Sequence, residues 1–134
     1  MKKRINGFTL IELLVAMTIV AVLTGISLVS YQGARKAGRD GKRKADLEQI
    51  RSALEMCRTD SGSYPLGSLS SGSAITCNSI TYLTIPNDVL TDRVFSYTGT
   101  ANTYTLCTAL EVSGGVVSGC GSCTVSCNYK VVNP

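Results

Sequence analysis

The sequence predicts an α+β protein in which a long N-terminal helix packs, by its second half, on a small antiparallel sheet. An apolar run of helical length occupies residues 8–29, and an amphipathic pattern continues to about residue 62. The C-terminal part alternates Thr, Val, Tyr and Leu in the manner of strands. With 134 residues in total, the part that follows the apolar run can bury one modest core.

Residues 8–29 form an apolar segment long enough to cross a lipid bilayer as a helix. At the rise of an α-helix this run spans about 33 Å, close to the thickness of the hydrocarbon core. Residues 1–4 carry three cations and no acid, which predicts that this end stays in the cytoplasm and the bulk of the chain lies outside it. An ordinary signal peptide is disfavoured, because the run exceeds a typical signal core and ends in further apolar sequence.

Glu12 places a carboxylate near the start of this apolar segment, where an acidic side chain is unfavourable. Insertion scales assign roughly 3 kcal/mol to an acidic residue at the centre of a membrane helix, and less toward its edge. Among laterally packed helices, the positive N-terminus of a neighbouring chain could neutralise Glu12, whereas bare hydrocarbon offers no partner. The competing interpretation is that Glu12 reaches the membrane interface in a simple single-pass anchor.

The sequence Gly7-Phe8-Thr9-Leu10-Ile11-Glu12 after a short basic leader resembles the class III signal of type IV pilins and type II secretion pseudopilins. The residues Gly62-x-Tyr64-Pro65 resemble the pseudopilin branch of these proteins. The resemblance implies a pilin-like fold. It also implies that a prepilin peptidase cuts between Gly7 and Phe8 and methylates the new amino group of Phe8, and that Glu12 serves filament assembly.

On this basis we expect four parts in the chain. A leader peptide occupies residues 1–7, a transmembrane or filament-core helix residues 8–30, an amphipathic helix extension residues 31–62, and a disulfide-stapled extracytoplasmic head with the antiparallel sheet residues 63–134.

The helix extension carries a narrow apolar stripe that we expect to face the sheet from Ala45 to Cys57. The helix should end near residues 60–62, just before Pro65. The stripe consists of apolar or small residues at mostly three- and four-residue steps: Ala34, Ala37, Gly41, Ala45, Leu47, Ile50, Leu54 and Cys57. On the opposite face we expect the exposed ion pairs Asp40–Lys44, Glu48–Arg51 and Arg51–Glu55.

A basic cluster occupies the start of the extension. It can be a solvated face that touches lipid headgroups or a neighbouring subunit, or a track that binds DNA. Because no aromatic residues interleave with the cations and acidic residues dilute the charge, the first interpretation is favoured. The cluster comprises Arg35, Lys36, Arg39, Lys42, Arg43 and Lys44.

Three segments of the head have predictable local structure. Residues 67–79, rich in Gly and Ser, are predicted to be a surface loop. Residues 94–97 and 103–110 should form a hairpin around the turn 98–102, and residues 124–132 a further strand.

Six cysteines without any histidine, in an exported chain, favour disulfides. We favour a Cys57–Cys77 pair, which would pin the following loop to the helix. The other four leave the pairing open: Cys107 could join Cys120, Cys123 or Cys127, with the remaining two closing a small loop. Alternatives are a zinc site on Cys107, Cys120, Cys123 and Cys127, or a redox pair at Cys120 and Cys123.

The sequence offers little chemistry for an enzyme. The lack of histidine excludes a Ser-His-Asp set, and no Gly-rich phosphate loop is present, so we expect no catalytic residues and no cofactor. Asp88 and Asp92 are calcium candidates only by resemblance, since similar pseudopilins carry an Asp-Pro calcium loop here whose Pro and Trp-Gly are absent from this chain.

We therefore expect a structural subunit of a type IV pilus-like filament, held in the inner membrane with its head outside the cytoplasm. Its partners would be other pilin subunits, the prepilin peptidase and an assembly platform. Three alternatives remain: a pseudopilin of a type II secretion system, a minor or tip pilin that binds a surface or DNA, and a membrane-tethered domain that never polymerises.

Overall fold

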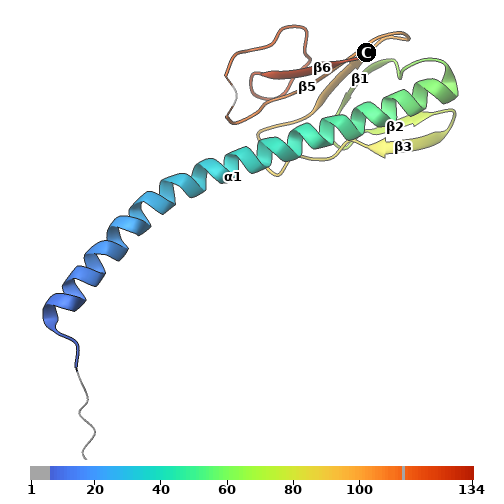
Figure 1. Cartoon of the computed structure of the whole chain (residues 1–134). Helices are drawn as coiled ribbons and strands as arrows, with labels where there is room; N and C mark the ends of the chain where they lie inside the picture. Colours follow the sequence, from blue (N-terminus) through green and yellow to red (C-terminus); the bar gives the residue numbers. More distant parts are fainter. Residues whose placement is uncertain (1–6, 113) are drawn as a thin grey trace, which may run out of the picture. The chain divides into compact units, whose positions relative to one another are not determined.

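The computed structural model describes residues 7–112 and 114–134, and the leader proposed for residues 1–7 therefore lies largely outside the described residues (Figure 1). The chain divides into two compact units, with the boundary between Arg35 and Lys36. Helix α1, Leu10–Ser61, contributes to both units as one helix of 52 residues. Each unit is described separately below.

The first unit is the apolar part of α1. Its large apolar side chains are exposed, and the helix is long and apolar enough to cross a membrane. Three hydroxyl groups in this part donate hydrogen bonds of 2.8 Å to backbone carbonyls three or four residues earlier, so they satisfy themselves within the helix. These hydroxyls belong to Thr18, Thr24 and Ser27.

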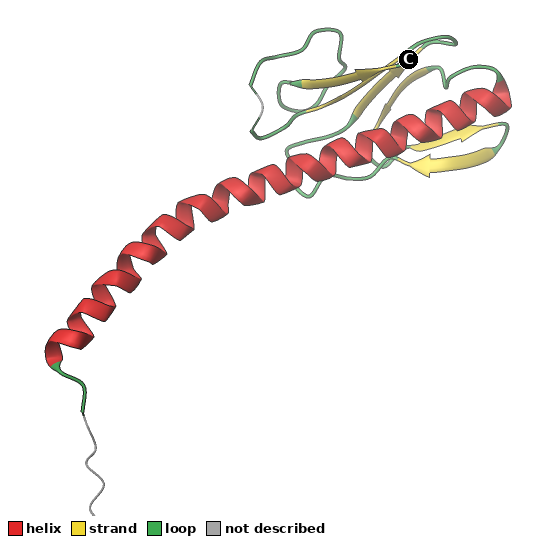
Figure 2. Ribbon diagram, viewed as in Figure 1, coloured by secondary structure: helices red, strands yellow, loops and turns green. Residues whose placement is uncertain are grey.

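The second unit combines the C-terminal part of α1 with two antiparallel sheets (Figure 2). The four-stranded sheet has the order β1-β4-β5-β6, and the two-stranded sheet pairs β2 with β3. The strands are β1 Gly67–Ser70, β2 Ala74–Cys77, β3 Ile80–Thr84, β4 Ser96–Gly99, β5 Tyr104–Thr108 and β6 Tyr129–Val132. This architecture confirms the predicted α+β fold class with a long helix on small antiparallel sheets.

The hairpin between β4 and β5 is the part of the sheet that the sequence describes best. Gly99 pairs with Tyr104, and the turn between them is closed by a 2.8 Å hydrogen bond from the Thr100 backbone N–H to the Thr103 carbonyl. A Cβ atom at Gly99 would lie 2.6 Å from the Pro65 carbonyl oxygen and would also collide with the Tyr97 ring. Glycine is therefore required at this position by the close approach of the chain.

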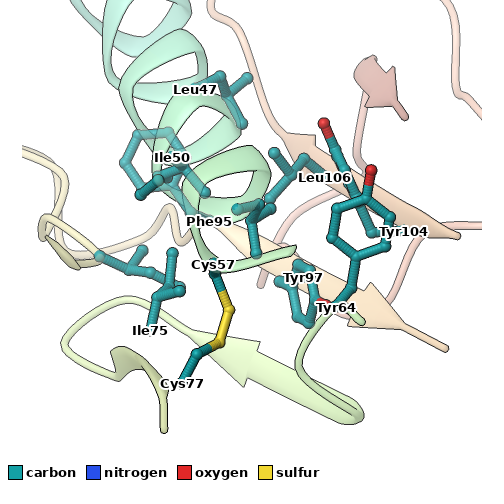
Figure 3. Packing of buried hydrophobic residues seen from close by; sticks show 13 residues of the cluster. Leu47, Ile50, Cys57, Tyr64, Ile75, Cys77, Phe95, Tyr97, Tyr104 and Leu106 are labelled. Atoms are coloured by element: carbon teal, nitrogen blue, oxygen red, sulfur yellow. A yellow bond between two sulfur atoms is a disulfide. The ribbon is translucent and has the colours of Figure 1, made fainter. Parts of the chain in front are cut away.

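The core forms where α1 meets both sheets (Figure 3). Leu47, Ile50, Leu54 and Cys57 follow each other at three- and four-residue steps and are each fully buried. Their partners come from the two sheets and the connecting segments: Tyr64, Ile75, Ile85, Phe95, Tyr97, Tyr104 and Leu106. The second half of the predicted apolar stripe thus faces the sheets as expected.

The first half of the stripe was predicted wrongly. Ala45 is exposed, and the apolar face begins only at Leu47. One and two turns earlier, the buried positions belong to the charged residues Arg43 and Asp40. The apolar pattern alone could not show this, because an arginine and an aspartate are buried only when other charged groups reach them.

Two predictions for the head need correction. The segment 67–79 was expected to be a loop, but it contains β1 and β2. The strand expected over residues 124–132 is shorter, since β6 begins at Tyr129 and only an isolated bridge joins Cys123 to Val125. The predicted end of the long helix is confirmed, because α1 ends at Ser61 and Gly62 adopts a φ of 78°.

Three disulfides staple the head. Cys57 at the end of α1 is joined to Cys77 in β2, which is the pairing favoured from the sequence. Closing a loop with a sequence separation of 20 stabilises a fold by roughly 3 kcal/mol through chain entropy. Cys107 is joined to Cys120, and Cys123 to Cys127. No free cysteine remains among the described residues, which argues against the zinc and redox alternatives.

Replacing Leu54 by alanine should destabilise the head strongly, because its side chain is fully buried against the sheets. We expect a loss of about 2 to 5 kcal/mol in the free energy of unfolding, measured by denaturant titration of the full chain in detergent. The matched control is Met56→Ala on the same helix, where half of the side chain is exposed. A comparable loss in both variants would contradict the assigned core face.

Candidate functional site: the helix start and a buried ion-pair network

The first candidate site is the short segment before α1. Gly7, Phe8 and Thr9 lie outside regular secondary structure, and the Phe8 side chain is 90% exposed. The peptide bond between Gly7 and Phe8 therefore lies in non-helical chain just ahead of the helix. A peptidase needs such an extended, accessible backbone at the bond that it cuts.

Thr9 and Glu12 form a reciprocal cap at the start of α1. The backbone N–H and the hydroxyl of Thr9 donate to Glu12 Oε2 over 2.9 and 2.8 Å, and the backbone N–H of Glu12 donates to Thr9 Oγ1 over 3.3 Å. This is the capping-box arrangement, which satisfies two backbone donors of a helix start. The sequence analysis treated Glu12 as a carboxylate in need of a partner but did not identify Thr9 as that partner. The pattern Thr9-x-x-Glu12 before an apolar run is the sequence signature of a capping box.

The second candidate site is a cluster of charges around Arg43 in the second unit. The Arg43 side chain is only 2% exposed. Its Nε and Nη2 donate to the two oxygens of Asp88 over 2.5 and 2.8 Å, and its Nη1 donates to Asp40 over 2.7 Å and to Glu111 over 2.8 Å. Arg39 makes a second fork to Glu111 over 2.7 and 2.6 Å. We call these five residues the Arg43 network.

The Arg43 network ties two loops to α1. Asp40 accepts hydrogen bonds of 2.8 to 3.0 Å from the backbone N–H groups of Glu111 and Val112. Asp88 accepts one of 2.8 Å from the backbone N–H of Leu90. A buried ion pair is weak evidence for stability, because desolvation offsets its attraction, but removing one partner leaves an uncompensated charge. The network therefore fixes which loop meets which turn of the helix.

The carboxylates of the network are held in their charged form. Hydrogen bonds from Arg39, opposed by burial and reinforced by Arg43, lower the pKa of Glu111 from 4.5 to about 2. Burial raises the pKa of Asp88, but hydrogen bonds from Arg43 and the Leu90 backbone outweigh it and bring the pKa below its ordinary value. Burial likewise opposes the backbone and Arg43 hydrogen bonds that lower the pKa of Asp40.

The basic cluster predicted from the sequence is divided by the structure. Arg39 and Arg43 belong to the Arg43 network, while the other four cations remain exposed: Arg35, Lys36, Lys42 and Lys44. The Lys44 ammonium lies 5.4 Å from the centroid of the Tyr129 ring. A DNA track would therefore have fewer free cations than the sequence suggested.

The predicted exposed ion pairs are partly present. Glu48 and Arg51 approach to 3.7 Å, as expected. The pairing of Asp40 with Lys44 was wrong, since Asp40 is buried against Arg43. Glu55 accepts hydrogen bonds from the hydroxyls of Tyr64 and Tyr104 instead of pairing with Arg51.

The calcium candidates do not converge. Both carboxylate oxygens of Asp88 are engaged by Arg43, whereas the Asp92 side chain is 61% exposed and lies 4.0 Å from Arg93. In the part of the chain that the structure describes, no group of three His, Cys, Asp or Glu side chains is arranged to hold a metal ion.

The N-terminal region matches a known family model. Residues 2–28 match the prokaryotic N-terminal methylation motif. The chain is 30% identical over 64 residues to the type II secretion system core protein G of Aeromonas hydrophila, which covers 48% of this chain and 45% of that protein. No solved structure matches the chain.

Fimbrial proteins of Dichelobacter nodosus are similar to the same extent. A probable minor fimbrial protein is 34% identical over 58 residues, covering 43% of this chain and 36% of that protein. The type IV major fimbrial protein FimA is 33% identical over 60 residues, covering 45% of this chain and 38% of that protein. The matched region thus spans less than half the length of these relatives.

Residues 2–28 carry the N-terminal methylation motif, and they lead into a long helix whose second half packs on small antiparallel sheets. The homologues of this chain are type IV fimbrial proteins and type II secretion core proteins, which confirms the resemblance to pilins and pseudopilins.

Acidification should weaken the head through Glu111. Because its folded-state pKa lies below its ordinary value, the ionised form stabilises the fold, and this contribution is lost as the pH falls from 4.5 toward about 2. We expect Glu111→Gln to lower the unfolding temperature of the full chain in detergent at neutral pH. The difference from the wild type should shrink across that interval.

The control for this experiment is Glu48→Gln, which removes an exposed carboxylate from α1. Its unfolding temperature should stay close to that of the wild type at every pH. A Glu111→Gln deficit that is independent of pH would show that packing, and not charge, is what the substitution disturbs.

Proposed function

We propose that this chain is a structural subunit of a type IV pilus-like filament. In this proposal a prepilin peptidase cuts between Gly7 and Phe8 and methylates Phe8, and the mature subunit then polymerises through the apolar part of α1. The observation that carries it is the methylation motif over residues 2–28, which includes the Thr9–Glu12 cap and the exposed apolar start of α1.

Processing creates the charge that assembly requires. Removal of the leader takes away its cations and leaves a single protonated amine on Phe8, which stays cationic when methylated. In a bundle of apolar helices there is no hydrophobic drive between the helices, so packing and polar contacts decide the association. A carboxylate at Glu12 and an amine on the neighbouring subunit then favour one axial register over the others.

Glu12 has a local partner before assembly. In the single chain, its carboxylate is occupied by the N–H and hydroxyl of Thr9. The amine of a neighbouring subunit would add to this carboxylate a contact in which both partners are charged, whereas the donors of Thr9 are uncharged. The proposed membrane stage and the proposed filament stage therefore both leave Glu12 satisfied.

The proposed cellular location follows from the apolar helix and the disulfides. The subunit would be a single-pass protein of the inner membrane with residues 36–134 outside the cytoplasm, and would join a periplasmic or surface filament on an assembly platform. An oxidising compartment agrees with the three disulfides. Its partners would be other pilin subunits, the peptidase and the platform.

A second candidate function is that of a pseudopilin in a type II secretion system. The similarity to core protein G of Aeromonas hydrophila favours it. The two roles differ in one observable: a pilus subunit is recovered in sheared surface fibres, whereas a pseudopilin is needed for the release of exported proteins. A minor or tip pilin that binds DNA has less support, because the Arg43 network removes two of the six cations.

Cleavage can be tested on native protein purified from cells that contain a prepilin peptidase. Mass spectrometry should find Phe8 as the first residue, with one methyl group on its amine. A Gly7→Glu variant, with a carboxylate in place of the small residue at the cut, should keep its leader. An intact start, or a cut at any other bond, would refute the proposal.

The role of Glu12 can be tested by substitution. Glu12→Gln keeps the shape of the side chain but removes the charge, so we expect filament yield to fall at least tenfold while membrane insertion and leader cleavage continue. Thr18→Val on the same helix is the matched control and should assemble normally. Normal filament yield from Glu12→Gln would show that the carboxylate has no part in assembly.

A further inference from the structure

An open groove lies on the outer side of α1 near its C-terminal end, with a volume of roughly 510 Å³. It lies wholly within the second unit, between the last turns of the helix and strand β3. Its floor is mainly apolar, through Met56 and the ring of Tyr82. The groove is lined by Ser52, Glu55, Met56, Thr59, Asp60 and Tyr82.

The groove carries fixed acidic groups. Glu55 is held by the Tyr64 and Tyr104 hydroxyls over 3.0 and 3.3 Å, and Asp60 accepts from the Asn78 side-chain amide over 3.2 Å. One turn before the groove, the Glu48 side chain is 58% exposed and approaches Arg51 to 3.7 Å. Carboxylates that are already held in place lose little freedom when a cation approaches them.

Exposed cations lie on the N-terminal side of the groove, on the part of α1 where the second unit begins. Because Arg39 and Arg43 are neutralised within the Arg43 network, the cations left at the surface there are Arg35, which lies 5.6 Å from the centroid of the Tyr31 ring, and Lys36, Lys42 and Lys44. Neither Lys36 nor Lys42 makes an ion pair with any carboxylate of the described residues. We call these three lysines the basic end of the helix.

The basic end cannot reach the groove of its own chain. Lys42 and Asp60 are 18 residues apart in one α-helix, which places them roughly 27 Å apart along its axis. A patch that is complementary to a different patch on an identical molecule produces a head-to-tail contact. When its rotation does not close, such a contact builds an open filament.

We propose that the groove binds the basic end of α1 from a second copy of this chain, packed parallel and shifted by roughly one Lys42-to-Asp60 spacing along the axis. This copy is a different neighbour from the one whose amine would meet Glu12, because that contact requires a shift of only four residues, roughly 6 Å. This inference rests on the proposed filament function and names the surface by which the heads would meet. Opposite charge favours this occupant, and the apolar floor can cover the aliphatic stems of lysine side chains. Nucleic acid is disfavoured, because the groove carboxylates would repel phosphate.

The shape of the basic end suits close packing. A Cβ atom added at Gly38 or at Gly41 would meet no atom within 4 Å, so both glycines lie at open surface. They leave the helix backbone uncovered between Lys36 and Lys42. A second helix or strand can therefore approach it more closely than it could approach a helix with larger side chains.

A zero-length carbodiimide cross-link between lysine and carboxylate tests the contact directly on wild-type filaments. Mass spectrometry should find Lys36, Lys42 or Lys44 joined to Glu55 or Asp60. A Lys42–Asp60 link has to connect two chains, because the helix holds these residues too far apart within one chain. Filaments that show no such link, or that link the groove to a different protein, would overturn the inference.

Charge exchange provides the second test in the full chain. Lys42→Glu and Asp60→Lys should each lower filament yield at least fivefold, and the double variant should recover most of it. Lys130→Glu makes the same change of charge on β6 and should assemble normally. Unfolding temperatures identify any variant whose head no longer folds, and the cross-link on wild-type filaments decides the matter in that case.

The outcomes separate this inference from the proposed function. If the wild type forms no filaments although Phe8 is exposed and methylated, the proposed function fails and the inference fails with it. If the wild type forms filaments but Lys42→Glu assembles as well as the wild type, only the head contact is refuted.

Discussion

One continuous helix has to satisfy two environments, and the rest of the structure follows from that constraint. From Leu10 onward α1 is apolar on all sides, and its hydroxyls bond to its own carbonyls. From Leu47 onward the same helix is apolar on one side only, and that side carries the core of the head. Where the first pattern changes to the second, the helix carries residues that suit neither an apolar surface on all sides nor an apolar face on one side.

The Arg43 network lies at this change of pattern. Two turns of α1 that could have carried apolar residues carry Asp40 and Arg43 instead, and both are buried. Their partners come from the loops at residues 88 and 111, so ion pairs and hydrogen bonds hold these loops to the helix. Such a contact is selective, because any other pairing of helix turn and loop would leave a buried charge without a partner.

The sequence predicted those elements whose causes are local. The end of α1 follows from Gly62 and Pro65, and the β4–β5 hairpin from a polar turn between alternating residues. Strand β1 was missed because Gly and Ser indicate a loop, whereas β1 is held by backbone pairing with the distant β4. Strand β2 was missed with it, although its partner β3 follows directly in the chain. Local composition cannot reveal a partner that is distant in the chain.

The same contrast between local and distant partners explains which parts of the candidate sites could be predicted from the sequence. Glu12 and the Gly7–Phe8 bond were visible because the motif is contiguous. The burial of Arg43 was not, since its partners Asp88 and Glu111 are 45 and 68 residues away. The Thr9–Glu12 cap lies within four residues, and the Thr-x-x-Glu pattern before an apolar run is enough to predict it.

The Thr9–Glu12 cap also affects how easily a subunit would leave the proposed filament. In the proposed filament, the Glu12 carboxylate would keep the donors of Thr9 and add the amine of a neighbour, so the net gain would be only what the amine contributes beyond Thr9. A subunit that left such a filament would return to the bilayer with its acidic group already accommodated by Thr9.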